Sequence, residues 1–125
     1  MPTIVMDLDG TLTVDEQNRA YADLTPNKAV VAKLREYRDQ GFRVAIYTAR
    51  NMRTHAQSVG KINALTLPVI IAWLQRHDIP YDEIHVGKPW ADEGGFYVDD
   101  RAIRPDEFVK LTHAEITALT AASLQ

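Results

Sequence analysis

Two carboxylates in alternate positions follow a short apolar run near the start of the chain. Residues 4–6 form the run, Asp7 and Asp9 are the carboxylates, and Gly10 comes next. Because side chains of an extended segment repeat every second residue, both carboxylates point to the same side, only ~7 Å apart. Two anions this close need a cation or a shared proton between them. The stretch predicts a buried strand with an anionic site at its carboxyl end, the alternative being an Asx turn after an edge strand.

Three later apolar runs also end at polar side chains. They end at Thr48, at Lys88 and at the pair Asp99 and Asp100. Open α/β sheets place their sites just beyond the carboxyl ends of parallel strands, so parallel strands would gather all these groups at one edge. Taken singly, each has a simpler interpretation: Thr48 as a helix cap, Lys88 as a solvated lysine and the acidic pair as a turn.

Helical patterns separate the runs. Thr25-Pro26 has the form of an N-cap followed by proline at the first helical position, and the apolar spacing predicts a helix over 26–40 that Gly41 closes. A second helix is predicted from Leu67-Pro68 to about His77. Strands over 42–48, 84–86 and 96–98 alternate with these helices. The order predicts an α/β fold, a three-layer sandwich on a mainly parallel sheet.

The connecting segments have their own patterns. Residues 14–23 are polar and predict a small hairpin flap, and residues 49–66 predict a long surface excursion that is either a functional lid or a solvated face. In the tail, Pro105 and the capping-box residues Thr112 and Glu115 predict two short helices. An outer strand over 108–111 is the alternative to the first of these helices.

The composition is that of an ordinary globular chain. The 125 residues, with 46% hydrophobic and 25% charged side chains, predict a single domain over residues 1–125. The net charge of −3 argues against broad binding to nucleic acid or an anionic membrane. The chain has no cysteine, its four histidines lack metal-ligand spacing, and no apolar run approaches the ~20 residues of a membrane span. We therefore expect a cytoplasmic protein without disulfides.

The ordered set of strand-end residues resembles the haloacid dehalogenase (HAD) superfamily. The hallmark of that superfamily is D-x-D-G-T on the first strand, a Thr or Ser ending the second, a later Lys and an acidic pair. Here these elements are residues 7–11, Thr48, Lys88 and residues 99–100. The resemblance spans nearly the full chain, from Thr3 to about Arg104, and implies a Rossmann-like, HAD-like fold.

The resemblance also implies catalytic roles. Asp7 would be the nucleophile that forms an aspartyl-phosphate, and Asp9 would act as general acid and then general base. Thr48 and Lys88 would hold the oxygens of the transferring phosphoryl group, and the lysine would also reduce repulsion among the carboxylates. The implied cofactor is Mg²⁺, a hard ion that prefers oxygen ligands. Its implied ligands are Asp7, the Asp9 main-chain carbonyl and one carboxylate of the pair Asp99 and Asp100, of which we favour Asp99.

The departures from the superfamily concern the substrate. Many members insert a cap domain after the first or second strand, but residues 11–25 and 49–66 leave room only for a flap and a loop, so we expect a capless protein. An open site would admit bulky substrates, or a homo-oligomer would complete it. Thr48, Ala49, Arg50, Arg53 and Lys88 are the candidate substrate-binding residues.

The sequence of three short stretches resembles particular groups within the superfamily. Residues 47–52, 86–89 and 98–101 are similar to small phosphatases of capsular or surface-polysaccharide synthesis, which implies hydrolysis of a small phosphorylated substrate such as a sugar phosphate. A more distant likeness is to polynucleotide 3′-phosphatase domains, in which case Arg50, Arg53 and Lys61 would hold the strand. The non-enzyme alternative is a phospho-accepting, receiver-like switch, although receivers carry the acidic pair on the first strand and the accepting aspartate on a later one.

Overall fold

The computed structural model describes residues 2–122, which divide into two compact units, Met1–Trp90 and Ala91–Gln125. The expectation of one domain over residues 1–125 stays a prediction. Among the described helices, none combines the length and the apolar character that crossing a membrane requires.

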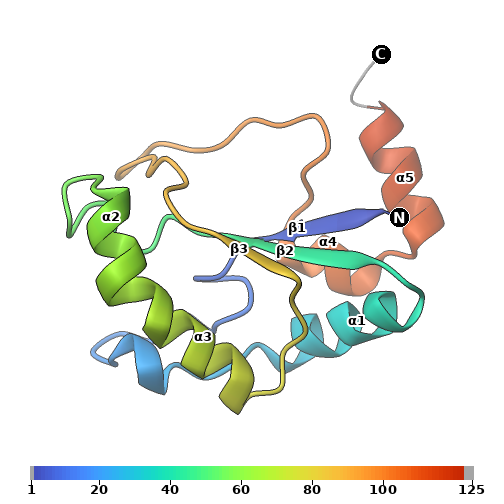
Figure 1. The fold of residues 1–125 in the computed structure, drawn as a ribbon. Helices are drawn as coiled ribbons and strands as arrows, with labels where there is room; N and C mark the ends of the chain where they lie inside the picture. The colour runs from blue at the N-terminus through green and yellow to red at the C-terminus, as the bar shows by residue number, and fades with distance from the viewer. Residues whose placement is uncertain (1, 123–125) are drawn as a thin grey trace. The chain divides into compact units, whose positions relative to one another are not determined.

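A parallel sheet forms the centre of the first unit. Its strands are β1 (Thr3–Met6), β2 (Arg43–Tyr47) and β3 (Glu83–His85), in the order β1-β2-β3. Both pairs are parallel, so the carboxyl ends of all three strands lie at the same edge, on the side of α2 in Figure 1. The sheet confirms the predicted α/β class, a Rossmann-like sandwich on a parallel sheet.

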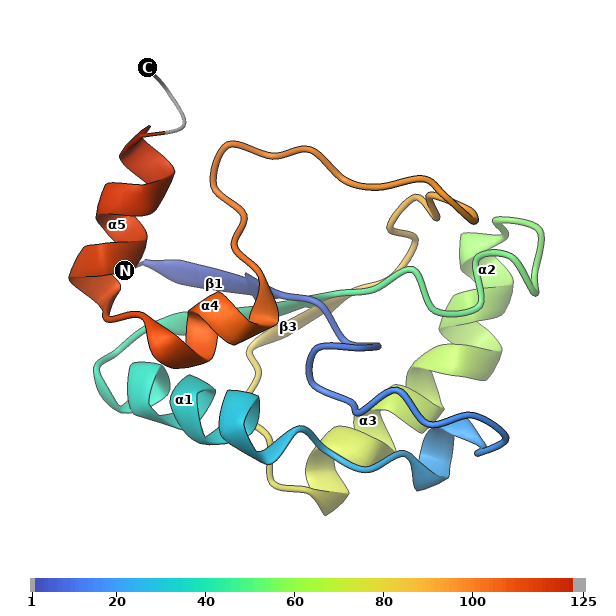
Figure 2. The ribbon, with the colours of Figure 1, turned by 180° about the vertical axis from the view of Figure 1, so that it is seen from behind.

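Two helices cover one side of this sheet. The helices α1 (Lys28–Asp39) and α3 (Leu67–Arg76) lie on the same side of the strands in both Figure 1 and Figure 2. Right-handed crossovers between strands that follow one another across a sheet place their helices on one face. The core of the unit is buried here and includes Met6, Val30, Leu34, Val44, Ile46, Ile70, Trp73 and Leu74. On β1 the burial is one-sided, because Val5 is 64% exposed.

The sequence predicted the end of α1 correctly but not its N-cap. The N-cap is Asn27, whose Oδ1 accepts a hydrogen bond from the Val30 N–H at 3.3 Å, so the predicted N-cap at Thr25 is wrong. Pro26 instead pairs with Thr13 in an isolated antiparallel bridge before the helix begins. Gly41 closes the helix as predicted, with a φ of 96° that favours glycine.

The segment 49–66 is more regular than predicted. Only its first part is irregular, because α2 (Val59–Lys61) begins after the N-cap Ser58 and continues through a π-helical turn η2 (Ile62–Thr66) into α3. Pro68 therefore lies inside a continuous helical run and does not start it. A proline has no N–H to donate, and a π-helical turn is one of the local distortions that accompany such an interruption.

The predicted flap is present and closed at its base. Val14 N–H donates to the Thr25 carbonyl at 2.8 Å, and the flap contains a single 3₁₀ turn, η1 (Tyr21–Asp23). The helix α3 holds the flap from below, because Trp73 Nε1 donates to the Leu24 carbonyl at 2.8 Å. The flap is therefore a fixed part of the first unit.

The second unit contains the two predicted tail helices. These are α4 (Pro105–Lys110) and α5 (His113–Ala122), and the Thr112–Glu115 capping box has both of its hydrogen bonds, at 2.9 and 3.2 Å. The alternative of an outer strand over 108–111 is wrong.

The predicted strand over 96–98 is also wrong. Residues 96–98 pair with no strand among the described residues, and Phe96 and Val98 are 80% and 87% exposed. Strand propensity in three residues does not by itself form a ladder, since strands are stabilised by their cross-strand neighbours.

Candidate functional site

The chain curls tightly as it leaves β1. The carbonyl of Leu8 accepts N–H groups from Leu12 and Thr13 at 2.9 and 3.0 Å, and Gly10 adopts a φ of 77°. Leu8 and Leu12 are fully buried, so they anchor this turn in the core. The turn leaves the Asp7 and Asp9 side chains 38% and 37% exposed at the carboxyl end of β1.

Asp7 has a hydroxyl and an ammonium group beside it. Thr11 Oγ1 donates to Asp7 Oδ2 at 3.1 Å, and Lys88 Nζ lies 3.7 Å from Asp7 Oδ1. Lys88 is held at this edge by its own backbone, because its N–H donates to the Thr48 carbonyl at 3.1 Å. The structure therefore brings Asp7, Thr48 and Lys88 together.

Thr48 lies directly beyond β2 and is buried. Its N–H donates to the His85 carbonyl at 3.0 Å, which extends the pairing of β2 with β3 by one step. Its Oγ1 accepts from the Arg50 N–H at 3.0 Å, a local turn that uses the hydroxyl as acceptor and leaves its proton for donation. No helix starts here, since α2 begins at Val59, so the interpretation of Thr48 as a helix cap is wrong.

Arg50 contacts the second carboxylate. Its Nε and Nη2 donate to Asp9 Oδ2 and Oδ1 at 3.0 and 2.7 Å, a bidentate ion pair. The Arg50 side chain is 1% exposed, so in this conformation its guanidinium is directed at Asp9 and away from solvent. This pair was not predicted from the sequence. An arginine in a loop can reach many groups, so the sequence carries no signal that identifies Asp9 as the partner of Arg50.

The other candidate substrate residues lie in the turn that follows. The Ala49 carbonyl accepts from the Met52 N–H at 3.0 Å, and Arg53 is exposed. Their role in binding stays a prediction.

Asp99 and Asp100 belong to the second unit. Both are exposed, and Asp99 Oδ1 accepts from the Arg101 N–H at 2.8 Å, which is the geometry of an Asx turn. Within residues 2–122, no three side chains of His, Cys, Asp or Glu gather as a metal-binding group. The metal role predicted for the acidic pair stays a prediction.

The donors of the first unit are compatible with Mg²⁺. Asp7 offers a partly exposed carboxylate, and the chain turns at Asp9 so that hard oxygens are concentrated at one strand end. Mg²⁺ is commonly held by one or two carboxylates, with waters and substrate phosphate completing its shell. The Asp7 carboxylate fits this description, and the Asp9 carbonyl stays a predicted ligand.

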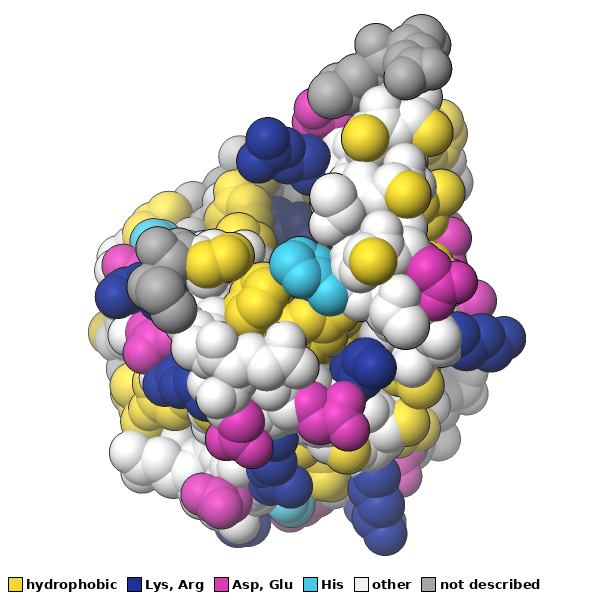
Figure 3. Space-filling model, turned by 90° about the vertical axis from the view of Figure 1, so that its right-hand side faces the viewer, with side chains coloured by type: hydrophobic (Ala, Val, Ile, Leu, Met, Phe, Trp, Pro, Cys, Tyr) yellow, Lys and Arg dark blue, Asp and Glu magenta, His cyan; other side chains and the backbone are white. Residues whose placement is uncertain are grey.

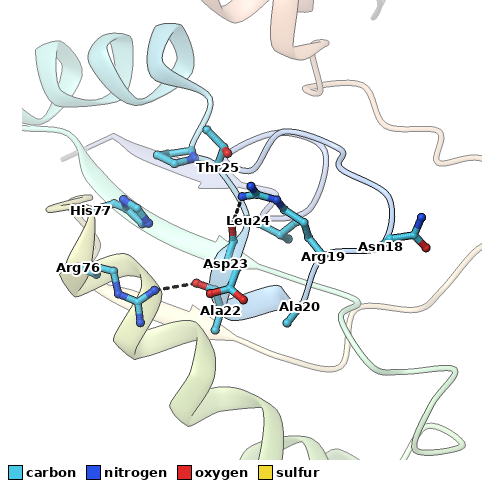
Figure 4. Close-up of a pocket in the computed structure, with 10 residues that line it drawn as sticks. Asn18, Arg19, Ala20, Ala22, Asp23, Leu24, Thr25, Arg76 and His77 are labelled. Atoms are coloured by element: carbon cyan, nitrogen blue, oxygen red, sulfur yellow. Dashed lines mark hydrogen bonds between the residues drawn. The ribbon is translucent and has the colours of Figure 1, made fainter.

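A cavity of about 640 Å³ lies elsewhere in the first unit. Flap residues and the end of α3 line it, including Arg19, Arg76 and His77 (Figure 4). Arg76 and Arg19 are bonded to flap carbonyls, those of Ala22 and Asp23, at 2.7 and 2.9 Å. None of the predicted site residues lines this cavity, so the carboxylate site is separate from it.

Charges of both signs share the surface. On the face shown in Figure 3, Lys and Arg side chains are interspersed with Asp and Glu. This distribution agrees with the acidic balance of the chain and differs from the clustered basic patch typical of nucleic-acid-binding surfaces.

Comparison with known proteins finds a structure of similar sequence and fold. A crystal structure of a target protein from Vibrio cholerae is 50% identical and superposes with a TM-score of 0.92 over 98% of each chain. No protein-family model matches the sequence, and no curated protein matches it.

Two structures of the Pnkp1/Rnl/Hen1 complex, which is an RNA repair complex, share the fold at low identity. One match has 21% identity and a TM-score of 0.52 over 74% of this chain and 27% of that chain. The other has 22% identity and a TM-score of 0.53 over 88% and 34%.

Proposed function

We propose that this chain, which belongs to the same family as the Vibrio cholerae protein, is a Mg²⁺-dependent phosphomonoesterase of the HAD type. The observation that carries the proposal is the arrangement at the end of β1. There Asp7 lies 3.7 Å from the Lys88 ammonium, and Asp9 follows on the same turn. A partly exposed carboxylate beside a fixed cation is suited to attack on an anionic phosphate, because the cation offsets the repulsion between the two anions.

The first step transfers the phosphoryl group to the protein. An Asp7 carboxylate oxygen attacks phosphorus, and the bond from phosphorus to the ester oxygen breaks. The electron pair of that bond goes to the leaving oxygen, which takes a proton from Asp9 and departs as an alcohol. The product on the protein is an aspartyl-phosphate.

The second step regenerates the carboxylate. A water oxygen attacks phosphorus while Asp9 takes the water proton. The bond between phosphorus and the Asp7 oxygen breaks, so inorganic phosphate leaves and Asp7 returns to its ionised form. Asp9 is then protonated for the next cycle.

The remaining groups position the phosphate. The Thr48 hydroxyl and the Lys88 ammonium would donate to its non-bridging oxygens. Asp7 and the Asp9 carbonyl would hold the Mg²⁺, and the ion would supply positive charge that neutralises the phosphoryl oxygens. Ala49 and Arg53 remain the candidates for contacts with the rest of the substrate, whereas a contact of Arg50 with the substrate would require its guanidinium to leave Asp9.

The substrate we propose is a small phosphorylated molecule, a sugar phosphate of polysaccharide synthesis. The choice of substrate rests on the resemblance to capless phosphatases of that kind and on the flap over residues 14–23, which stands in place of a cap domain. We propose in addition that a homo-oligomer completes the open site.

Hydrolysis of p-nitrophenyl phosphate with Mg²⁺ tests the function directly. We expect turnover by the wild type, loss of at least ~10³-fold in Asp7→Asn and no change in the control Asp15→Asn, an exposed carboxylate on the flap. Removal of Mg²⁺ with a chelator should abolish turnover, and added Mg²⁺ should restore it. Equal rates for the wild type and Asp7→Asn would overturn the proposal.

A polynucleotide 3′-phosphatase is the second candidate. The observation that favours it is the shared fold with a chain of an RNA repair complex, and the net charge of −3 argues against it. Rates on sugar phosphates and on a 3′-phosphorylated oligonucleotide, measured side by side, decide between the two. A phosphoprotein that persists after treatment with acetyl phosphate would instead support the receiver-like switch.

A further inference from the structure

The flap places an aromatic ring on the arginine that holds Asp9. The Arg50 guanidinium carbon lies 4.2 Å from the centre of the Tyr21 ring, a cation–π contact. Tyr21 is the first residue of η1, whose neighbouring carbonyls at Ala22 and Leu24 are bonded to side chains of α3. The ring is therefore held over the guanidinium by a flap that is itself anchored.

Arg50 has two of its three nitrogens on Asp9 and none of its donors in solvent. The third nitrogen, Nη1, is buried and has no hydrogen-bond partner among the described residues. A buried donor without a partner costs free energy, on the order of 1–3 kcal/mol, so this conformation is maintained by its surroundings rather than by Arg50 alone. The surroundings are Asp9 on one side and the Tyr21 ring on the other.

The geometry fixes Asp9 and leaves room for a proton on its carboxylate. Each carboxylate oxygen has two lone pairs, and Arg50 takes one on each, so one lone pair per oxygen remains for a proton. A bidentate guanidinium sets the plane as well as the place of a carboxylate, which a single ammonium cannot do. Asp9 is 37% exposed and thus open to the reacting groups.

We propose that Tyr21 and Arg50 are positioning residues that set Asp9 for proton transfer, so that the flap controls protonation of the leaving group. This inference rests on the proposed phosphatase function. In the step concerned, the bond from phosphorus to the ester oxygen breaks and the Asp9 proton moves to that oxygen. Misplacement of Asp9 slows this step only where the leaving oxygen needs the proton.

Two phosphate esters distinguish a loss of Asp9 positioning from a general loss of active enzyme. An alkyl phosphate releases a strongly basic alkoxide that requires protonation, whereas p-nitrophenyl phosphate releases a weakly basic phenolate that does not. The value of kcat/KM reports the steps up to departure of the leaving group. The ratio of kcat/KM for the two esters therefore responds to proton donation and is insensitive to a loss of folded enzyme.

Arg50→Lys and Tyr21→Ala should each lower kcat/KM for the alkyl phosphate more than for p-nitrophenyl phosphate. General acid catalysis contributes about 10²- to 10⁴-fold, so we expect a selective loss of at least ~10-fold in Arg50→Lys and a smaller one in Tyr21→Ala. Tyr21→Phe keeps the aromatic ring that contacts the guanidinium, so its ratio of kcat/KM for the two esters should equal that of the wild type. Gln17→Ala, an exposed flap substitution, should leave the ratio unchanged.

The results that would contradict this inference differ from the result that would contradict the phosphatase function. Equal losses on both esters, or a gain on the alkyl ester, would overturn the inference while leaving the phosphatase function intact. A wild-type protein inactive on both esters would overturn both. Should Arg50→Lys not fold, the surface substitutions Tyr21→Ala and Tyr21→Phe still decide the question, because Tyr21 is 42% exposed.

Discussion

At the scale of single residues, the ion pair of Asp7 with Lys88 is what distinguishes this strand end from an ordinary turn. Chemical type and spacing predicted both residues, because carboxylates at alternate positions share a side and parallel strands end at one edge. The partnership of Arg50 with Asp9 was not predictable in this way, since an arginine in a loop can reach many groups. Which one it reaches depends on the conformation of residues 48–50, where the Thr48 hydroxyl accepts from the Arg50 N–H.

Lys88→Met tests the cation beside Asp7. The substitution keeps a similar length and removes the charge that we propose attracts the phosphate and offsets its repulsion by Asp7. Hydrogen bonds to charged groups contribute about 1.5–3 kcal/mol, so kcat/KM should fall by about 10- to 100-fold. Steady-state kinetics on p-nitrophenyl phosphate measure this, with Lys28→Met, at an exposed position of α1, as the matched control. A loss that is the same in both variants would contradict the role of Lys88.

At the scale of elements, Asp82 ties α1, β2 and the start of β3 together. Its carboxylate accepts from both terminal nitrogens of Arg38 at 2.7 and 3.0 Å and from the Val44 N–H at 2.8 Å. The sequence showed where the helix and strands lie but not this connection between them, because the partners are about 40 positions apart and polar. Exposed ion pairs add little by themselves, so the backbone hydrogen bond is the more important part of the connection.

The pH dependence of stability tests this connection. The hydrogen bond from the Val44 N–H, with Arg38 and Arg43 nearby, holds the pKa of Asp82 below its usual value of 3.8. A carboxyl whose pKa is lowered by folding stabilises the protein above the unfolded pKa, and this stabilisation is lost as the pH falls through the folded one. Asp82→Asn should therefore lower the Tm near neutral pH, and the difference from the wild type should shrink below about pH 4.

Thermal unfolding of both proteins across this pH range makes the measurement, and Asp39→Asn, an exposed carboxylate at the end of α1, is the control. A difference in Tm that does not depend on pH would show that Asp82 contributes through packing rather than through its charge.

At the scale of the whole molecule, the fold class was predictable and several local features were not. Alternating apolar runs and helical patterns are repeated over many residues, so the parallel sheet, α1 and α3 followed from them, whereas α4 and α5 were predicted from Pro105 and the Thr112–Glu115 capping box. The strand over 96–98 was predicted from only three residues. So short a segment forms a strand only beside a partner strand, and it has none among the described residues. The helical start at Val59 was missed because the segment is rich in polar side chains and Pro68 suggested a later start, although the buried residues Ile62, Thr66 and Ile70 recur every four positions.

The central claim is that Asp7 becomes phosphorylated during turnover. Wild-type protein mixed rapidly with substrate and Mg²⁺, quenched in acid and digested, should yield a peptide that contains residue 7 and carries one phosphoryl group. Because an acyl phosphate is reactive, hydroxylamine should release that group, and Asp7→Asn should show neither the group nor turnover. Turnover with no phosphoryl group on the protein, or with the group on any other residue, would contradict the account.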